Sequence, residues 1–98
     1  MDTQKLENLL NEMLVWGDIS YRSYINNALQ FAEAIKSSKM KIGETYTLFN
    51  RYNATPEEIA ELKRFKTKLH KALGDNGTCY HVLIEGKKNI AVTIRRAR

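Results

Sequence analysis

Three side chains of this 98-residue chain have the chemistry of metal ligands or of a nucleophile with its base: His70, Cys79 and His81. Cys79 and His81 are two residues apart, so a strand would present both on one face. A tetrahedral metal site needs four ligands, and no further ligand stands at a suitable spacing in the sequence. A Cys–His dyad needs a third side chain to orient the histidine, and the sequence shows no such partner. The five glycines are scattered and form no phosphate-binding loop. The sequence therefore predicts a non-enzymatic protein with no catalytic residues, no metal and no cofactor.

The basic side chains carry the stronger chemical signal. The chain has 16 Lys and Arg against 11 Asp and Glu, a formal net charge of +5. Residues 1–38 hold 3 basic against 5 acidic side chains, a net charge of −2, whereas residues 39–98 hold 13 against 6, a net charge of +7. Such segregated positive charge is typical of proteins that bind polyanions. Nine side chains are candidate phosphate contacts: Lys63, Arg64, Lys66, Lys68, Lys71, Lys87, Lys88, Arg95 and Arg96.

A structural interpretation of the same charges stands beside the functional one. Basic residues late in a helix complement the helix dipole, and acidic residues early in it do the same. Hairpin tips and chain ends are also commonly rich in Lys and Arg because charge there favours solubility. The charge pattern alone leaves both interpretations open.

Two N-terminal helices are predicted from the spacing of apolar residues. The first spans about residues 3–16 and ends before Gly17, because its apolar side chains recur at i, i+3, i+4, i+7 and i+8: Leu6, Leu9, Leu10, Met13 and Leu14. The second begins at a cap on Asp18 or Ser20 and continues to about Lys36. The short link between them places the two helices in contact.

The middle of the chain has a mixed pattern. Alternation over residues 39–42 predicts a short strand, or an extended entry into a turn at Gly43. We interpret residues 45–52 as a short helix, although Thr and Tyr also favour strands. The side chains expected to point inward from this helix are Tyr46, Leu48, Phe49 and Tyr52.

The C-terminal half gives the clearest local signals. Thr55, Pro56 and Glu58 stand at the cap, first and third positions of a predicted helix over residues 56–73, which Gly74 ends. Its apolar face is Ile59, Leu62, Phe65, Leu69 and Leu73. After a turn at residues 75–77, strands 79–85 and 89–96 form a β-hairpin with a basic tip at residues 86–88. The inward residues of this hairpin are Tyr80, Val82, Ile84, Ile90, Val92 and Ile94.

Length and composition place these elements in a single small α+β domain over residues 1–98. The helical pair occupies residues 1–38, and the basic part occupies residues 39–98. A single cysteine, Cys79, excludes an intramolecular disulfide and suits a reducing compartment, so we expect a cytoplasmic protein. No apolar run has the roughly 18 residues of a membrane span, and no membrane partner is expected.

The predicted order of elements resembles a winged helix-turn-helix. In this resemblance, residues 45–52 form the second helix of the motif, Asn53 and Ala54 its turn, and residues 56–73 its third helix, with residues 79–96 as the wing. The stretches Ile42–Leu48 and Leu62–Phe65 are also similar to those of small DNA-binding proteins of mobile genetic elements. The resemblance implies DNA binding and a role as a replication or mobile-element accessory factor.

One departure from the winged-helix pattern shapes the expected contacts. The first turns of such a third helix usually enter the major groove, but here they carry Glu57, Glu58 and Glu61, which phosphates repel. We therefore expect the later turns of the helix, the wing and the C-terminal arginines to contact single-stranded DNA or a DNA backbone without sequence specificity. The aromatic side chains that are candidates for base stacking, or else for core packing, are Tyr46, Tyr52 and Tyr80.

The alternative function is a protein-binding module or inhibitor. It would dock on a partner protein, or form a homodimer, through the two N-terminal helices, with Met13, Trp16, Tyr21 and Tyr24 as contacts. The basic face could equally dock on an acidic protein. A transcriptional repressor is a third option, and the acidic start of residues 56–73 counts against it.

Overall fold

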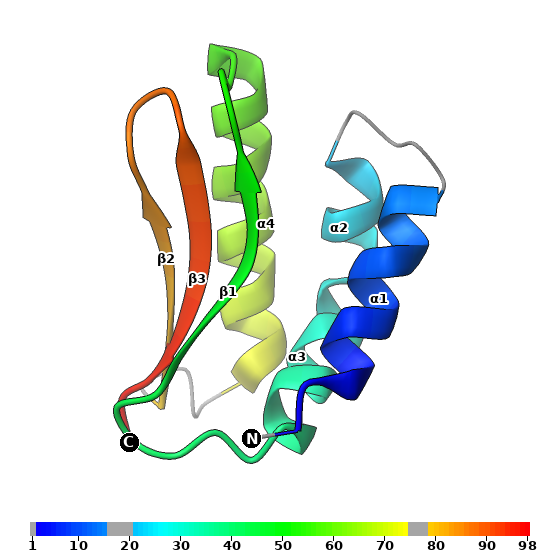
Figure 1. Cartoon of the computed structure of the whole chain (residues 1–98), viewed down its shortest axis with the longest axis vertical. Coiled ribbons are helices and arrows are strands. Elements are labelled where there is room, and N and C mark those ends of the chain that lie inside the picture. Colours follow the sequence, from blue (N-terminus) through cyan, green and yellow to red (C-terminus); the bar gives the residue numbers. More distant parts are fainter. Residues whose placement is uncertain (1, 16–20, 75–78) are drawn as a thin grey trace.

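A long helix packs between a three-stranded antiparallel sheet and a group of shorter helices (Figure 1). The structure is a computed structural model that describes residues 2–15, 21–74 and 79–98. Within these residues the elements, in chain order, are α1 (Gln4–Val15), α2 (Arg22–Asn26), α3 (Ala28–Ser37), β1 (Thr45–Arg51), α4 (Pro56–Leu73), β2 (Tyr80–Glu85) and β3 (Ile90–Arg96). The sheet order is β1-β3-β2. The predicted α+β fold, the helix over residues 56–73 and the C-terminal hairpin are confirmed.

The start of α4 is fixed by hydrogen bonds local to the sequence. The Thr55 hydroxyl accepts from the Glu58 amide at 3.1 Å, and the Glu58 carboxylate accepts from the Thr55 amide at 3.2 Å, which is the predicted capping box. The Arg51 guanidinium, at the end of β1, donates to the same carboxylate. This charge-assisted hydrogen bond holds the pKa of Glu58 below its usual value and ties β1 to the first turn of α4.

The predicted second helix is divided into α2 and α3 at Asn27. The Asn27 side-chain amide donates to the Ser23 carbonyl at 2.7 Å, the same carbonyl that accepts from the Asn27 backbone amide at 3.0 Å. Asn27 has φ −105° and ψ 19°, outside the range of a regular helix. An Asn side chain that competes for a backbone acceptor in this way commonly interrupts a helix.

The prediction of a helix over residues 45–52 is wrong, because this segment forms the strand β1. Tyr46 pairs with Ile94 of β3, and Phe49 pairs with Val92, with Leu48 as the extra residue of a β-bulge. The physical reason is the second edge of β3, whose backbone groups require a strand as partner, and this requirement overrides the ambiguous local preference. The helix-turn-helix expected from residues 45–52 and 56–73 is therefore not formed.

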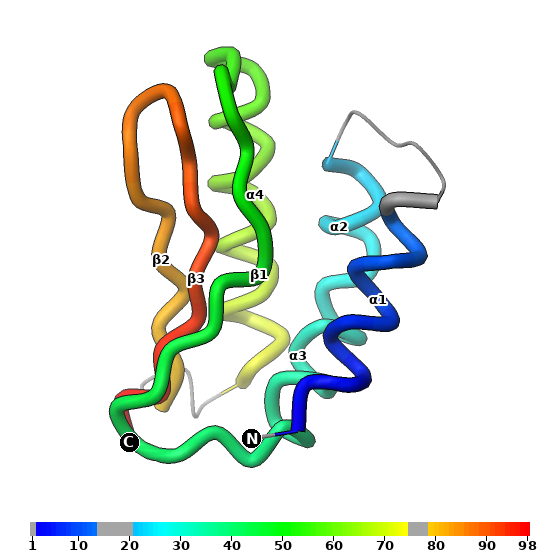
Figure 2. Tube along the Cα trace, viewed as in Figure 1, coloured from blue at the N-terminus to red at the C-terminus, as the bar shows by residue number. Residues whose placement is uncertain are grey.

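Of the two alternatives predicted for residues 39–42, the short strand is not formed, and the segment leads instead into a turn at Gly43 before β1. The Lys41 amide donates to the Glu44 carboxylate at 2.7 Å, and the Glu44 amide donates to the Lys41 carbonyl at 3.0 Å. Gly43 has φ +90° and its amide donates to the Arg96 carbonyl at 2.7 Å. In Figure 2 this link passes along the base of the molecule beside the C-terminus of the chain.

Aromatic rings from four elements meet around α4. Phe65 is fully buried, with its ring centroid 5.5 Å from that of Phe31 and 6.0 Å from that of Tyr24, both edge-on. Phe49 of β1 lies 4.8 Å from Tyr24 and 6.4 Å from Phe65. Edge-to-face pairs of this kind are favourable beyond the area that they bury. The predicted apolar face of α4 is buried, with Ile59 at its margin: Leu62, Phe65, Leu69 and Leu73.

The hairpin tip is held against the turn between β1 and α4. The Ala54 amide donates to the Lys88 carbonyl at 2.9 Å, and the Asn53 amide donates to the Asn89 side chain at 3.3 Å. Gly86 has φ +106°, and a Cβ at this position would lie 2.0 Å from the Asn89 carbonyl oxygen. Only glycine fits this turn without a shift of the backbone.

Several predicted features lie outside the described residues. They are the cap at Asp18 or Ser20, the helix stop at Gly17, the contact role of Trp16, and the turn over residues 75–77.

Substitution Gly86→Ala should destabilise the fold by about 3 kcal/mol, because it adds a backbone clash to the strain of a positive φ. The matched variant is Gly43→Ala, at φ +90° with nothing within 4 Å of its Cβ, which should cost only about 1 kcal/mol. Urea unfolding followed by circular dichroism measures both. Equal losses in the two variants would contradict the close packing of the hairpin tip.

Candidate nucleic-acid interface

An open groove of about 630 Å³ lies between α2 and α4. Arg22, Ile25 and Asn26 of α2 form one wall. The other wall is one side of α4: Ala60, Lys63, Arg64, Thr67, Lys68 and Lys71. We call this the α2–α4 groove. It brings together four of the nine predicted phosphate contacts and adds Arg22, which is not among the nine.

The periodicity of α4 explains why this groove is both open and basic. Positions 60, 64, 67 and 71 recur at i, i+4, i+7 and i+11, so they lie along one face, next to the buried face of Leu62 and Phe65. Ala60 and Thr67 are small, so they leave space between the longer side chains. This alternation of small and basic positions is a signal in the sequence. The position of Arg22 depends on how α2 packs, and sequence spacing does not reveal it.

The groove has a different charge at each end. At the start of α4 it continues into a hollow that is lined by Glu57 and Glu61 as well as by Arg22 and Arg64. The Glu61 carboxylate accepts a hydrogen bond from the Tyr21 amide at 2.8 Å, and Glu58 is bound to Arg51. Two of the three acidic side chains at this end thus hold the fold together. Towards the end of α4 the groove lining has no acidic side chain.

The groove cations are free to bind an external anion. Among the described residues, the one ion pair is Arg51 with Glu58, so none of the five basic groove residues is paired with a carboxylate. All five are exposed: Arg22, Lys63, Arg64, Lys68 and Lys71. Five unpaired cations along one groove create a positive potential that attracts phosphates.

Lys66 lies on the opposite flank of α4, near the edge of the sheet. It is half-buried and lies beside His70, whose Nε2 accepts a hydrogen bond from the Val82 amide of β2 at 3.0 Å. Burial lowers the pKa of His70, and the charge of Lys66 and the neighbouring His81 lower it further. His70 therefore caps the open edge of β2 as a neutral acceptor.

The remaining predicted contacts lie on the sheet. Lys87 and Lys88 are exposed at the hairpin tip, and Arg95 is exposed on β3 beside His81 of β2, its partner in the sheet register. Arg96 has a structural role, because its guanidinium donates to the Tyr80 hydroxyl at 2.6 Å and to the Arg98 carbonyl, and stacks on the Tyr80 ring at 4.7 Å.

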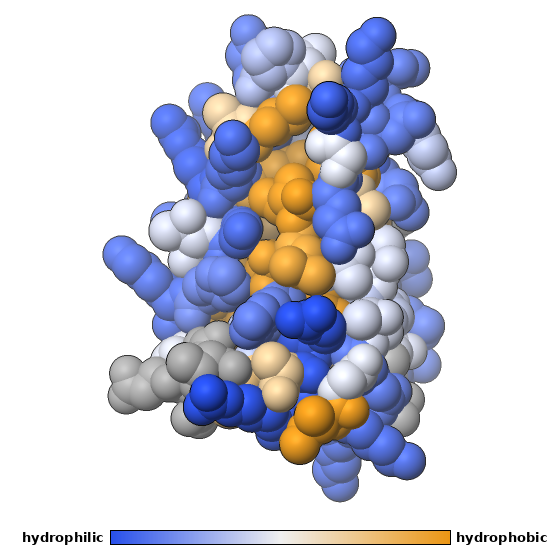
Figure 3. Space-filling model, turned by 90° about the vertical axis from the view of Figure 1, so that its left-hand side faces the viewer, coloured by the Kyte–Doolittle hydropathy of each residue, from blue (hydrophilic) through white to orange (hydrophobic). Residues whose placement is uncertain are grey.

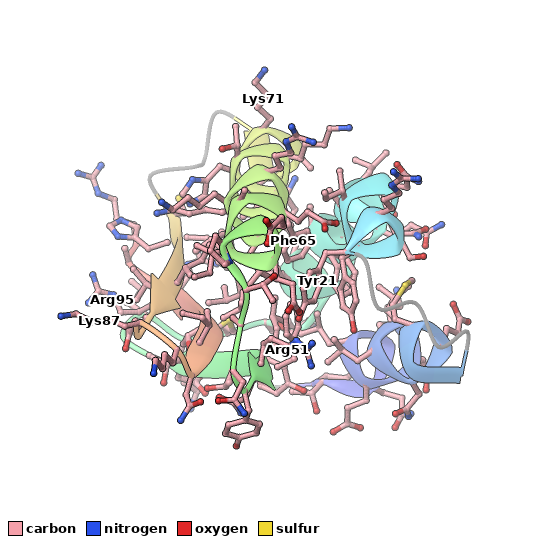
Figure 4. The ribbon with its side chains drawn as sticks, turned by 90° about the horizontal axis from the view of Figure 1, so that it is seen from above. Tyr21, Arg51, Phe65, Lys71, Lys87 and Arg95 are labelled. Carbon is pink, nitrogen blue, oxygen red and sulfur yellow. The ribbon has the colours of Figure 1, made fainter. Side chains whose placement is uncertain are left out.

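The exposed members of the predicted basic set thus divide into two surfaces instead of one. Figure 4 shows Lys71 projecting from the end of α4 at the top of the view, whereas Lys87 and Arg95 project from the sheet at the left. Between them, the face in Figure 3 has a strip of apolar surface flanked by hydrophilic side chains. Ile59 of α4 and Ile84 of β2 are partly buried and pack against the core.

The three tyrosines that were candidates for stacking have different environments. Tyr80 is 4% exposed and belongs to the core. Tyr46 is half-buried, and burial raises its pKa. Tyr52, expected to point inward, is 65% exposed. Of these three rings, only that of Tyr52 is accessible to a base.

The candidate metal and nucleophile residues are dispersed. Within residues 2–15, 21–74 and 79–98, no group of three or more His, Cys, Asp and Glu side chains could hold a metal ion. His70 is turned to the β2 backbone, and Cys79 is a half-buried free thiol. In the same residues, no helix has the length and apolar character needed to cross a bilayer.

Comparisons with protein-family models, with curated proteins and with solved structures gave no match to this chain. The functional assignment therefore depends on the geometry and charge of the molecule itself.

The free energy of unfolding should decrease as the pH falls below about 6.5, the ordinary pKa of histidine. Because the fold lowers the pKa of His70, the unfolded chain binds more protons than the folded chain in this range. A proton on Nε2 would also remove the acceptor of the Val82 amide. Urea unfolding between about pH 7.5 and about pH 5 measures the effect.

The variant His70→Gln should show a weaker dependence on pH, since a Gln carbonyl accepts the same hydrogen bond without titrating. His81→Gln, at an exposed position of β2, removes only the smallest of the three causes that lower the pKa of His70, so it should keep most of the wild-type pH dependence. If His70→Gln kept the full pH dependence, the role of His70 as a neutral cap would be wrong.

Proposed function

We propose that this protein is a non-enzymatic nucleic-acid-binding protein, and that its α2–α4 groove holds the phosphate backbone. The observation that carries the proposal is the groove itself. Five exposed basic side chains from two helices line it, and the described residues offer them no carboxylate partner. Backbone contacts of this kind give affinity and orientation without sequence specificity.

The charge distribution along α4 supports a direction for the bound strand. Glu57 and Glu61 line the hollow at the start of α4, where they repel phosphates. Lys68 and Lys71 line the groove further along the helix, where its lining has no acidic side chain. We therefore infer that the backbone lies along the later turns of α4 and leaves the molecule near Lys71. The sequence predicts contacts from this same part of the helix.

The alternative of a protein-binding module has weaker support. Three of the four side chains expected to dock on a partner are buried in the core, at 6–7% exposure: Met13, Tyr21 and Tyr24. Trp16 lies outside the described residues. A groove of about 390 Å³ between α1 and β1 does have an apolar floor, with Leu10, Leu48 and Phe49 in its lining. It has one charged lining residue, Glu7, so it offers less to a partner than the α2–α4 groove offers to a polyanion.

Removal of two groove cations should weaken nucleic-acid binding and reduce its dependence on salt. For the variant Arg64→Ala/Lys68→Ala, the slope of log affinity against log salt should become shallower by about 1.8 on duplex DNA and about 1.4 on a single strand. Arg22→Ala should reduce the slope by about half as much, since it removes one contact. Fluorescence anisotropy of labelled oligonucleotides at several salt concentrations measures these values.

The control is Lys5→Ala/Lys36→Ala, which removes the same charge from exposed positions on α1 and α3. This variant should keep nearly the wild-type slope. An equal loss in both double variants would mean that net charge acts without a site. Absence of binding by the wild type at low salt would exclude the proposed function.

A further inference from the structure

We propose that the open face of the sheet is a second nucleic-acid-binding surface, and that it takes an unpaired strand whose bases stack on Tyr52. This inference rests on the proposed function, because it assumes that nucleic acid is the ligand. It assigns the sheet-side cations, which the α2–α4 groove leaves unused, to a separate contact.

The alternation of side chains defines this open face. Ile90, Val92 and Ile94 of β3 are buried on the side of α4, so the residues between them point to the opposite side. The register aligns three rows across the sheet on that side: Thr45–Arg95–His81, Thr47–Thr93–Leu83 and Asn50–Ala91–Glu85. In Figure 1 the described helices all lie away from this face.

The chemistry of the face suits a single strand. Its middle row, Thr47–Thr93–Leu83, is uncharged, and the hydroxyls of Thr47 and Thr93 are 3.4 Å apart. Arg95 supplies a cation at one end and Lys87 at the other, and both project from the sheet at the left of Figure 4. Glu85 is the one carboxylate in the three rows. An open sheet face can support unpaired bases.

Tyr52 completes the surface at the hairpin end. The side chain of Arg51, the last residue of β1, is turned to Glu58 of α4, and strand alternation continued by one residue into the turn places Tyr52 on the open side. Hydrogen bonds from Asn53 and Ala54 to the hairpin tip fix the Tyr52 turn beside Lys87 and Lys88. An exposed ring beside two lysines combines base stacking with phosphate neutralisation.

The ring of Tyr52 is exposed because it lies outside the aromatic core. The Tyr52 side chain is 65% accessible and has no place in the aromatic cluster around Phe65. Exposed tyrosine is common where one face of the ring is free to stack on a base, and stacking is tolerant of base identity. The surface therefore fits unpaired DNA or RNA of any sequence.

The test compares the affinity of single-stranded and duplex probes for Tyr52→Ala. Labelled dT and U oligomers of about 20 nucleotides, and a duplex of about 20 base pairs, span roughly 70 Å, more than the 33 Å length of the molecule. Tyr52→Ala should weaken binding of one or both single strands by about 5- to 150-fold and leave duplex affinity unchanged. Whether dT or U suffers the larger loss shows which strand the surface prefers. Tyr52→Phe keeps the ring and should bind as the wild type.

Two controls separate the possible outcomes. Leu29→Ala removes a similarly exposed apolar side chain, 62% accessible, from α3 and should change nothing. If Tyr52→Ala left single-strand affinity unchanged while Arg64→Ala/Lys68→Ala weakened it, this inference would be overturned and the proposed function would stand. If the wild type bound duplex and neither single strand, this inference would also be overturned and the proposed function would stand. Binding of the wild type to no probe would overturn both.

Discussion

The burial of Phe65 is the constraint on which both candidate surfaces depend. Its ring is enclosed by Phe31, Tyr24 and Phe49, which belong to α3, α2 and β1. These contacts fix α4 at once against the shorter helices and against the sheet. The distance between α2 and α4 sets the width of the basic groove, and the seat of the sheet on α4 determines which sheet face is left open. A poorly packed cluster would alter both surfaces together.

Three different sides of helix α4 serve three different roles. One face is apolar and buried, a second face carries the groove cations, and the flank with Lys66 and His70 closes the edge of β2. Its acidic residues are confined to the first turns, where they favour the helix dipole and bind Arg51 and the Tyr21 amide. Structural and electrostatic requirements are therefore met by different residues of one helix.

The sequence predictions are correct where the deciding interactions are between residues close in the chain, and wrong where they are between distant residues. The start and end of α4 were predicted correctly because a Thr cap, a Pro at the first helical position and a closing Gly act within a few residues. The hairpin was predicted from two runs of β-branched and aromatic residues on either side of turn residues 86–88. Residues 45–52 were predicted wrongly because Thr and Tyr fit either structure, and the deciding contact is with β3, more than 40 residues away in the chain. Asn27 is an exception, because its local hydrogen bond divides a helix that the apolar spacing predicts as continuous.

The sequence by itself determined which residues are apolar, which are charged, and where α4 and the hairpin begin and end, because these depend on composition, periodicity and local hydrogen bonds. It also indicated the basic face of α4. Only the tertiary structure decided that Arg22 joins that face, that Lys87 and Arg95 lie on another, and that Tyr52 is exposed while Tyr80 is buried. The physical reason is that side chains distant in sequence become neighbours only when the packing around Phe65 sets the angles between helices and sheet.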